Sequence, residues 1–159
     1  MSENKSLRQR IDEDLRGAMK AGDKTRLGVL RLIKTKMLEA EVALRAGKGR
    51  DYQLEDAEAN RVLAICAKQR RDAIESFEKG GRDDLVAAER AELAILREYL
   101  PEQLTTEQIT RIVQEAIAST GAASPRDIGA VMKVAMPRMK GAADGRTVNR
   151  IASSLLAGK

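Results

Sequence analysis

Residues 24–46, KTRLGVLRLIKTKMLEAEVALRA, decide the fold class of this 159-residue chain. Large apolar residues recur along the segment at alternating intervals of three and four, at Leu30, Ile33, Met37, Ala40 and Leu44. This spacing places their side chains on one face of an α-helix. The segment therefore predicts one long amphipathic helix, closed by the glycines at 47 and 49.

The same spacing continues on both sides of this helix. Ser6 can cap an earlier helix that Gly22 ends, and Asp23 can cap the long helix itself. These two helices are expected to form an antiparallel hairpin with a very short turn. A third long helix is expected over residues 54–79 and a fourth over residues 83–100.

Beyond Pro101 the helical segments become shorter. A capping-box pattern that begins at Thr105 starts the fifth helix. Pro125 lies in the first turn of the sixth, and Pro137 is expected to disrupt its last turn. The seventh helix begins at Asp144-Gly145.

No segment shows sustained period-two alternation, so the fold class is predicted to be all-α. The change in helix length near Pro101 predicts two helical subdomains. Residues 1–100 form an N-terminal subdomain of four longer helices. Residues 101–159 form a C-terminal subdomain of three short helices.

The absence of several residue types excludes most catalytic and metal chemistry. There is no His, and Cys66 is the single Cys, so no intramolecular disulfide or zinc cluster can form. The three aromatic residues, Tyr52, Phe77 and Tyr99, are too few for base stacking on exposed rings. We therefore predict no catalytic residue, no metal and no cofactor.

A cytoplasmic location without membrane contact is expected. The first ten residues, MSENKSLRQR, are polar, whereas a signal peptide shows an apolar stretch of about 7–15 residues. The longest uncharged run, residues 116–125, has ten residues, and a membrane span needs about 20.

Charge is distributed unevenly along the chain, whose net charge is +5. Residues 1–50 carry +6, residues 51–107 carry −6 and residues 108–159 carry +5. Such asymmetry is consistent with an anionic partner for one or both ends, and equally with charge segregation that serves no binding.

Four residues of the third and fourth helices could carry chemistry, but structural roles are expected for each. Cys66 lies on the apolar row and is expected to be a buried thiol without a catalytic base. Gln69 falls on the same row and is expected to make a buried hydrogen bond between helices. Glu89 and Glu92 share a face of the fourth helix, where salt bridges are their expected role.

One basic segment is the candidate binding site. Residues 132–146 join the sixth and seventh helices through a glycine-containing loop, and five basic residues lie in or beside it: Lys133, Arg138, Lys140, Arg146 and Arg150. Mobile cations beside the free backbone N–H groups of a helix start suit phosphate. A solvated turn with ordinary surface lysines is the alternative, and the chemistry alone favours it.

Several short strings in order resemble the GatB/YqeY family over the whole chain. They are Leu-Arg-Leu-Ile at 30–33, Lys-Gln-Arg at 68–70, Gly-Arg-Asp-Asp-Leu at 81–85, Glu-x-x-Glu-Leu at 89–93, Tyr-Leu-Pro at 99–101, Asp-Ile-Gly-x-Val-Met at 127–132 and Lys-Gly-x-Ala-Asp-Gly at 140–145.

The resemblance implies a free-standing YqeY-like protein with a two-part helical fold. It is similar to the C-terminal tail of the B subunit of tRNA-dependent amidotransferase, which helps to hold tRNA. That enzyme is a carbon–nitrogen ligase with glutamine as amido-N-donor, and its catalytic centres lie in other parts of the assembly. The residues of this chain do not supply that activity, so an enzyme label would be inherited only from the association.

Three functional readings follow. The first is a tRNA-binding accessory module, whose partners would be tRNA and proteins of translation or aminoacyl-tRNA metabolism. The second is a non-catalytic helical protein-interaction module. The third is an enzyme. Salt dependence separates the first two, because phosphate binding weakens steeply with salt.

Overall fold

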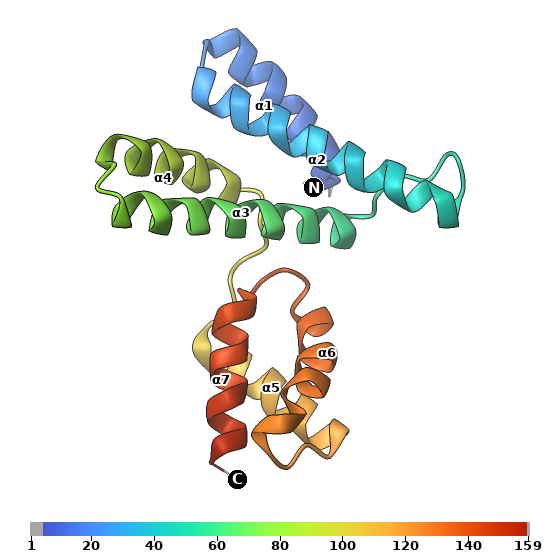
Figure 1. Cartoon of the computed structure of the whole chain (residues 1–159). Helices are drawn as coiled ribbons and strands as arrows, with labels where there is room; N and C mark the ends of the chain where they lie inside the picture. The colour runs from blue at the N-terminus through green and yellow to red at the C-terminus, as the bar shows by residue number, and fades with distance from the viewer. Residues whose placement is uncertain (1–4, 159) are drawn as a thin grey trace. The chain divides into compact units, whose positions relative to one another are not determined.

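The structure, a computed structural model, describes residues 5–158 and is helical throughout, with no strand in that range (Figure 1). The chain divides into two compact units, residues 1–100 and residues 101–159. Each unit has an apolar core of its own. The all-α prediction is therefore confirmed. No helix in the described range is long and apolar enough to cross a bilayer.

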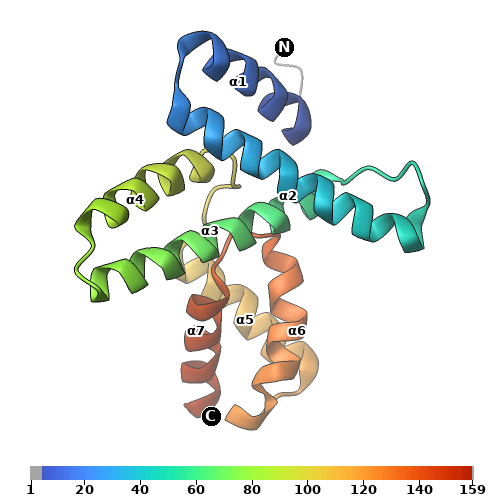
Figure 2. The ribbon, with the colours of Figure 1, turned by 45° about the horizontal axis from the view of Figure 1, so that its top comes forward.

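The first unit consists of two helical hairpins. Helices α1 (Leu7–Ala21) and α2 (Lys24–Lys48) form one, and α3 (Asp56–Lys79) and α4 (Asp83–Arg97) form the other (Figures 1 and 2). The turn between α1 and α2 is short because Gly22 adopts the left-handed conformation, with φ at 67°, and Asp23 caps α2. The core of this unit includes the fully buried Ile11, Leu30 and Leu63.

The second unit packs three helices around a small core. These are α5 (Thr106–Thr120), α6 (Ile128–Met139) and α7 (Gly145–Ala157), with a 3₁₀ turn η1 (Pro125–Asp127) before α6. Val113, Val131 and Val148, one from each helix, are fully buried.

Three element boundaries differ from the sequence prediction. Helix α3 begins at Asp56 rather than Leu54, with Glu55 as its N-cap, and the Leu54 N–H donates to the Glu41 carboxylate. Helix α4 ends at Arg97, and Tyr99 packs into the core beyond it. Pro137 lies within the last turn of α6, where a disruption was expected, and the helix continues past it to Met139.

Candidate nucleic-acid interface

The five predicted binding residues all lie on the solvent side of the second unit. Lys133 and Arg138 belong to α6, Lys140 follows α6 directly, and Arg146 and Arg150 belong to α7; all five are exposed. What they bind is a separate question, which depends on how they are arranged.

The structure brings only some of these cations onto a common face. Arg146 and Arg150 are four residues apart on α7 and therefore share one side of that helix. Lys133 and Arg138 are five residues apart on α6, which separates their directions by about 140°. The five residues therefore form a band around α6 and α7 rather than one compact cluster.

Two backbone hydrogen bonds hold the loop between α6 and α7. The Leu104 N–H donates to the Ala142 carbonyl at 2.8 Å, and the Ala142 N–H donates to the Met139 carbonyl at 2.8 Å. Ala142 and Ala143 are buried against the core of the second unit. Lys140 is thus held on an ordered loop beside the start of α7.

Lys140 also adopts an unusual backbone conformation. Its φ is 48°, and it is the one non-glycine residue with positive φ in the described range. A left-handed residue with a Cβ costs roughly 1–2 kcal/mol of conformational energy. This conformation, followed by Gly141 with φ at 79°, turns the chain sharply from α6 into the loop.

Two acidic residues of the second unit, Glu115 and Asp127, already bind groups of the protein. Glu115 of α5 forms an ion pair with Arg138 at 3.3 Å, so one predicted cation is already partnered. The Asp127 carboxylate accepts the N–H groups of Ala123 and Ser124 at 2.9 and 3.1 Å, and these bonds lower its pKa. By contrast, Lys133, Lys140 and Arg150 form no ion pair with any described residue.

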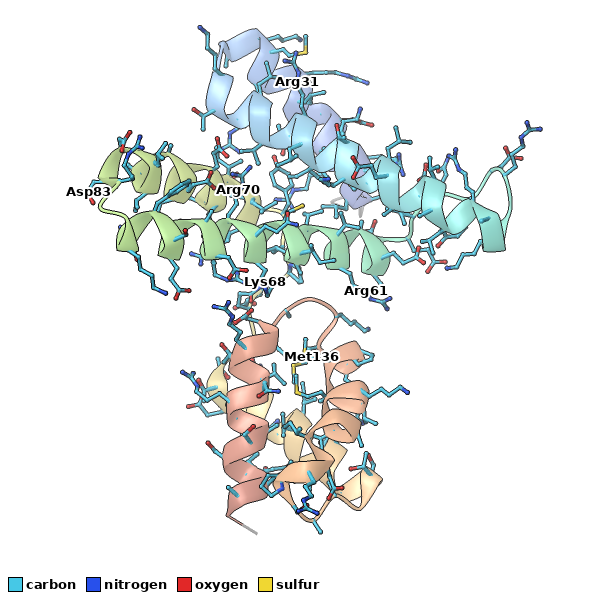
Figure 3. All side chains as sticks on the ribbon, in the orientation of Figure 1. Arg31, Arg61, Lys68, Arg70, Asp83 and Met136 are labelled. Carbon is cyan, nitrogen blue, oxygen red and sulfur yellow. The ribbon has the colours of Figure 1, made fainter. Side chains whose placement is uncertain are left out.

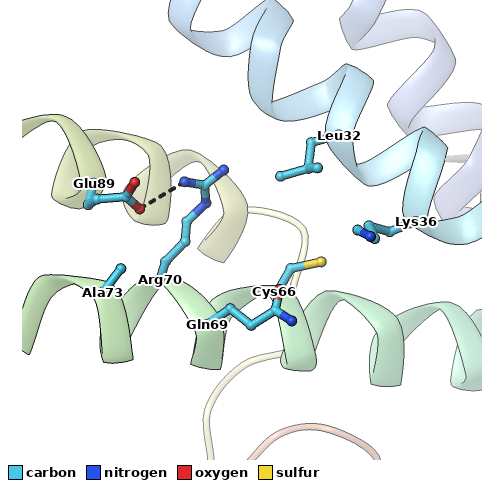
Figure 4. Close-up of a pocket in the computed structure, with 7 residues that line it drawn as sticks. All are labelled: Leu32, Lys36, Cys66, Gln69, Arg70, Ala73 and Glu89. Atoms are coloured by element: carbon cyan, nitrogen blue, oxygen red, sulfur yellow. Dashed lines mark hydrogen bonds and ion pairs between the residues drawn. The ribbon is translucent and has the colours of Figure 1, made fainter. Parts of the chain in front are cut away.

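The inward-facing polar residue of α3 is Arg70, one position after the predicted Gln69. Gln69 is exposed, so the predicted buried hydrogen bond is wrong. Arg70 beside it turns inward, with its side chain only 13% exposed, and pairs with Glu89 at 2.9 Å (Figure 4). It also pairs with Glu92. The salt-bridge role predicted for the two glutamates is confirmed.

Cys66 is buried in the core of the first unit, as predicted. Burial raises the pKa of its thiol, so the neutral, weakly reactive form dominates near pH 7. No group of three His, Cys, Asp or Glu side chains that could hold a metal ion occurs between residues 5 and 158.

Comparison with known proteins identifies the family of this chain. The family model described as "Yqey-like protein" matches residues 8–156, which is nearly the whole chain. This chain belongs to the YqeY-like family.

Curated relatives of this chain include altered inheritance of mitochondria protein 41 from several yeasts. The protein of Saccharomyces cerevisiae is 32% identical over 87 residues, which are 55% of this chain and 44% of the relative. That of Kluyveromyces lactis is 34% identical over 111 residues, 65% of this chain and 55% of the relative. The chain thus spans about half the length of these relatives, which are named as mitochondrial proteins.

Proposed function

We propose that this YqeY-like protein is a non-catalytic accessory module that binds tRNA through its second unit. The observation that carries the proposal is the set of exposed cations on α6, the following loop and α7 that lack an acidic partner: Lys133, Lys140 and Arg150. Helical RNA is recognised through its shape, phosphates and 2′-hydroxyls, which requires cations and polar groups rather than aromatic rings.

The arrangement of these cations supports binding to an extended backbone. A band around two helices can follow successive phosphates, whereas a compact cluster would suit a single phosphate group. The hydrogen-bonded loop fixes the backbone position from which the exposed Lys140 side chain extends. The sequence resemblance to the tail of the amidotransferase B subunit, which helps to hold tRNA, supports tRNA as the ligand of the second unit.

The non-catalytic part of the proposal rests on the chemistry of the side chains. The chain has no His, and its single thiol is buried with a raised pKa. The chain thus lacks imidazole, the most common general base near neutral pH, and its neutral buried thiol is a poor nucleophile. We expect a cytoplasmic protein; the relatives' mitochondrial names are compatible with the same role, since both compartments contain tRNA.

Binding of tRNA to a triple variant tests the proposal. Replacing Lys133, Lys140 and Arg150 together by Ala should weaken binding about tenfold or more at moderate salt, because each phosphate that is no longer neutralised keeps its counterions. The slope of log K against log salt should become shallower by about one for each such phosphate. Fluorescence anisotropy with labelled tRNA over a salt series measures both quantities.

The matched control removes the same number of exposed cations from the α1–α2 hairpin, at Arg16, Lys20 and Lys24. This variant should bind tRNA like the parent. If the hairpin variant loses binding and the first does not, the RNA binds on the hairpin. A parent protein that shows no salt-dependent affinity for tRNA would overturn the proposal and favour the protein-interaction alternative.

A further inference from the structure

The solvent side of α7 carries one strip of polar side chains. Four residues at positions i, i+3, i+4 and i+7 of the helix make up this strip: Arg146, Asn149, Arg150 and Ser153. An α-helix turns by about 100° per residue, so these four positions fall within an arc of about 100°. In Figure 3, side chains project from the side of α7 that is turned away from α5 and α6. We call these four residues the α7 strip.

The α7 strip holds positive charge that the helix itself does not neutralise. The sequence of α7, GRTVNRIASSLLA, contains no Asp or Glu. Arg150 forms no ion pair with any residue between 5 and 158. Each guanidinium group carries five N–H donors in a planar fork that matches the oxygens of a phosphate. The strip therefore presents two phosphate-binding groups, four residues apart.

Asn149 lies between these two arginines and is exposed. Its Oδ1 accepts a long hydrogen bond from the Ser153 hydroxyl, at 3.4 Å. Its amide nitrogen carries two N–H donors, which have no hydrogen-bond partner among residues 5–158. Asn is also a poor helix former, so it contributes less to the stability of α7 than most residues would at this position. The amide of Asn149 is thus available to a ligand.

An amide flanked by cations matches the minor groove of double-helical RNA. In A-form RNA this groove is wide and shallow, and it displays the 2′-hydroxyls beside the phosphates. A hydroxyl oxygen can accept a hydrogen bond from an amide N–H. DNA has no 2′-hydroxyl, whereas both nucleic acids offer phosphates to arginine. The amide can therefore distinguish RNA from DNA, and the two arginines cannot.

We propose that Asn149 recognises a 2′-hydroxyl of double-helical RNA and thereby gives α7 a preference for RNA over DNA. The inference rests on the proposed binding of tRNA by the second unit, and it adds the residue that selects RNA. Arg146 and Arg150 bind phosphates and hold α7 against the groove. The amide nitrogen of Asn149 then donates to the ribose that lies between those phosphates.

Three hairpin oligonucleotides of one sequence test this role with the full-length protein: RNA, its 2′-fluoro analogue and DNA. The 2′-fluoro ribose keeps the A-form but has no hydroxyl, so its comparison with RNA isolates the proposed hydrogen bond from the shape of the groove. Fluorescence anisotropy measures the dissociation constants over a salt series. We expect the parent to bind RNA about fivefold more tightly than the 2′-fluoro hairpin, which is the effect of one ordinary hydrogen bond.

Three variants separate the amide from the charges. Asn149→Ala should weaken binding to RNA about fivefold and change binding to the 2′-fluoro hairpin by less than about twofold, so that the two affinities become equal. Arg150→Gln should weaken binding to both and make the salt slope shallower by about one. Gln114→Ala, the matched control, removes an exposed amide from α5 and should change neither affinity by more than about twofold.

A loss of fold does not imitate these results. Because Ala is a better helix former than Asn, the Asn149→Ala variant should melt no lower than the parent. Circular dichroism during heating measures this.

The contrary outcomes distinguish this inference from the proposed function. A parent that binds RNA and the 2′-fluoro hairpin equally, or an Asn149→Ala variant that keeps the preference of the parent, overturns the role of Asn149 and leaves the binding of tRNA intact. A parent that binds tRNA but none of the hairpins also overturns it, since the double helix is then not the ligand. A parent that binds neither tRNA nor any hairpin overturns the proposed function as well.

Discussion

Among the described residues, Glu41 is the one charged residue that is buried, with 3% of its surface exposed. It accepts hydrogen bonds from Arg8 of α1, from Arg45 at 2.9 Å and from the Leu54 N–H at 3.0 Å. Burial opposes ionisation of this carboxyl, but the Leu54 N–H and the two guanidinium groups outweigh it and hold its pKa below the usual value. One side chain thereby joins α1, α2 and the segment that precedes α3.

Replacing Glu41 by Ala should lower the free energy of unfolding by about 2–3 kcal/mol. Removal of one member of a buried ionic group leaves its partners uncompensated. The value lies at the low end because the side chains of Arg8 and Arg45 are 39% and 35% exposed and can be hydrated. Urea denaturation measures the change. Glu39→Ala, which removes an exposed glutamate of the same helix, should cost less than about 0.5 kcal/mol.

The same carboxylate predicts how stability depends on pH. A group whose pKa is lower in the folded state stabilises above its unfolded pKa, about 4.3 for Glu, and this contribution is lost as pH falls. Glu58 acts in the same direction, because hydrogen bonds from Lys48, Tyr52 and the Glu55 N–H lower its pKa to about 2. The free energy of unfolding should therefore fall between about pH 4.3 and pH 2. A Glu41→Ala variant with the same acid dependence as the parent would contradict the role of Glu41.

The starts of α1 and α5 were predictable because their caps are local. The reciprocal hydrogen bonds of a capping box form at Ser6 with Gln9 and at Thr105 with Gln108. Each box spans four consecutive residues, so neighbouring sequence contains all the information. The ends that were mispredicted depend on distant groups instead. Leu54 is bonded to Glu41, and Tyr99 donates to Asp14 at 2.6 Å.

Side-chain direction along α3 was harder to predict than the helix itself. From Cys66, an advance of three residues turns about 60° short of a full revolution and an advance of four turns about 40° beyond it. Gln69 and Arg70 therefore lie on opposite sides of the apolar row. The prediction chose Gln69 because it follows Cys66 by three residues, a spacing that places both on one row of the helix. The two acids on α4 that make Arg70 suitable lie 19 and 22 residues away in the sequence.

Replacing Arg70 by Met should lower the free energy of unfolding by about 1–2 kcal/mol. The methionine can fill the apolar part of the site, but Glu89 and Glu92 lose the cation between them. Both glutamates are at least 25% exposed, so hydration limits the cost. Hydrogen exchange should increase in α4, which Arg70 links to α3. Lys68→Met, at an exposed ion pair two residues earlier, should change stability by less than about 1 kcal/mol.

The sequence identified the basic residues of the candidate interface but not the long-range contacts that hold this region together. Exposure of the five cations follows from their places between the apolar residues of α6 and α7. The anchoring of the loop depends on Leu104, which lies 38 residues before its partner Ala142. The pairing of Arg138 with Glu115 likewise requires α5 to lie beside α6. Such long-range pairings have no local signature in a single sequence.

For the whole molecule, separate cores predict separate folding. A fragment of residues 101–159 should fold cooperatively but melt at a lower temperature than a fragment of residues 1–100. The smaller fragment buries a smaller fraction of its surface, and domains of about 60 residues are marginal. Scanning calorimetry of both fragments measures the two transitions. A smaller fragment that melts as high as the larger one would refute this expectation.

The hydrogen bonds that close the first unit join residues made at very different times on the ribosome. Tyr99 donates to Asp14, and Arg10 and Arg26 bind Glu98, across 72 to 88 residues of sequence. At about 5–20 residues per second, synthesis of the intervening chain takes about 4–18 s. During that interval the α1–α2 hairpin exists without the end of α4, and its apolar residues are available to chaperones. A pause in translation before codon 98 would prolong this exposed state. A later pause, after residue 100 has emerged from the ribosome, would not.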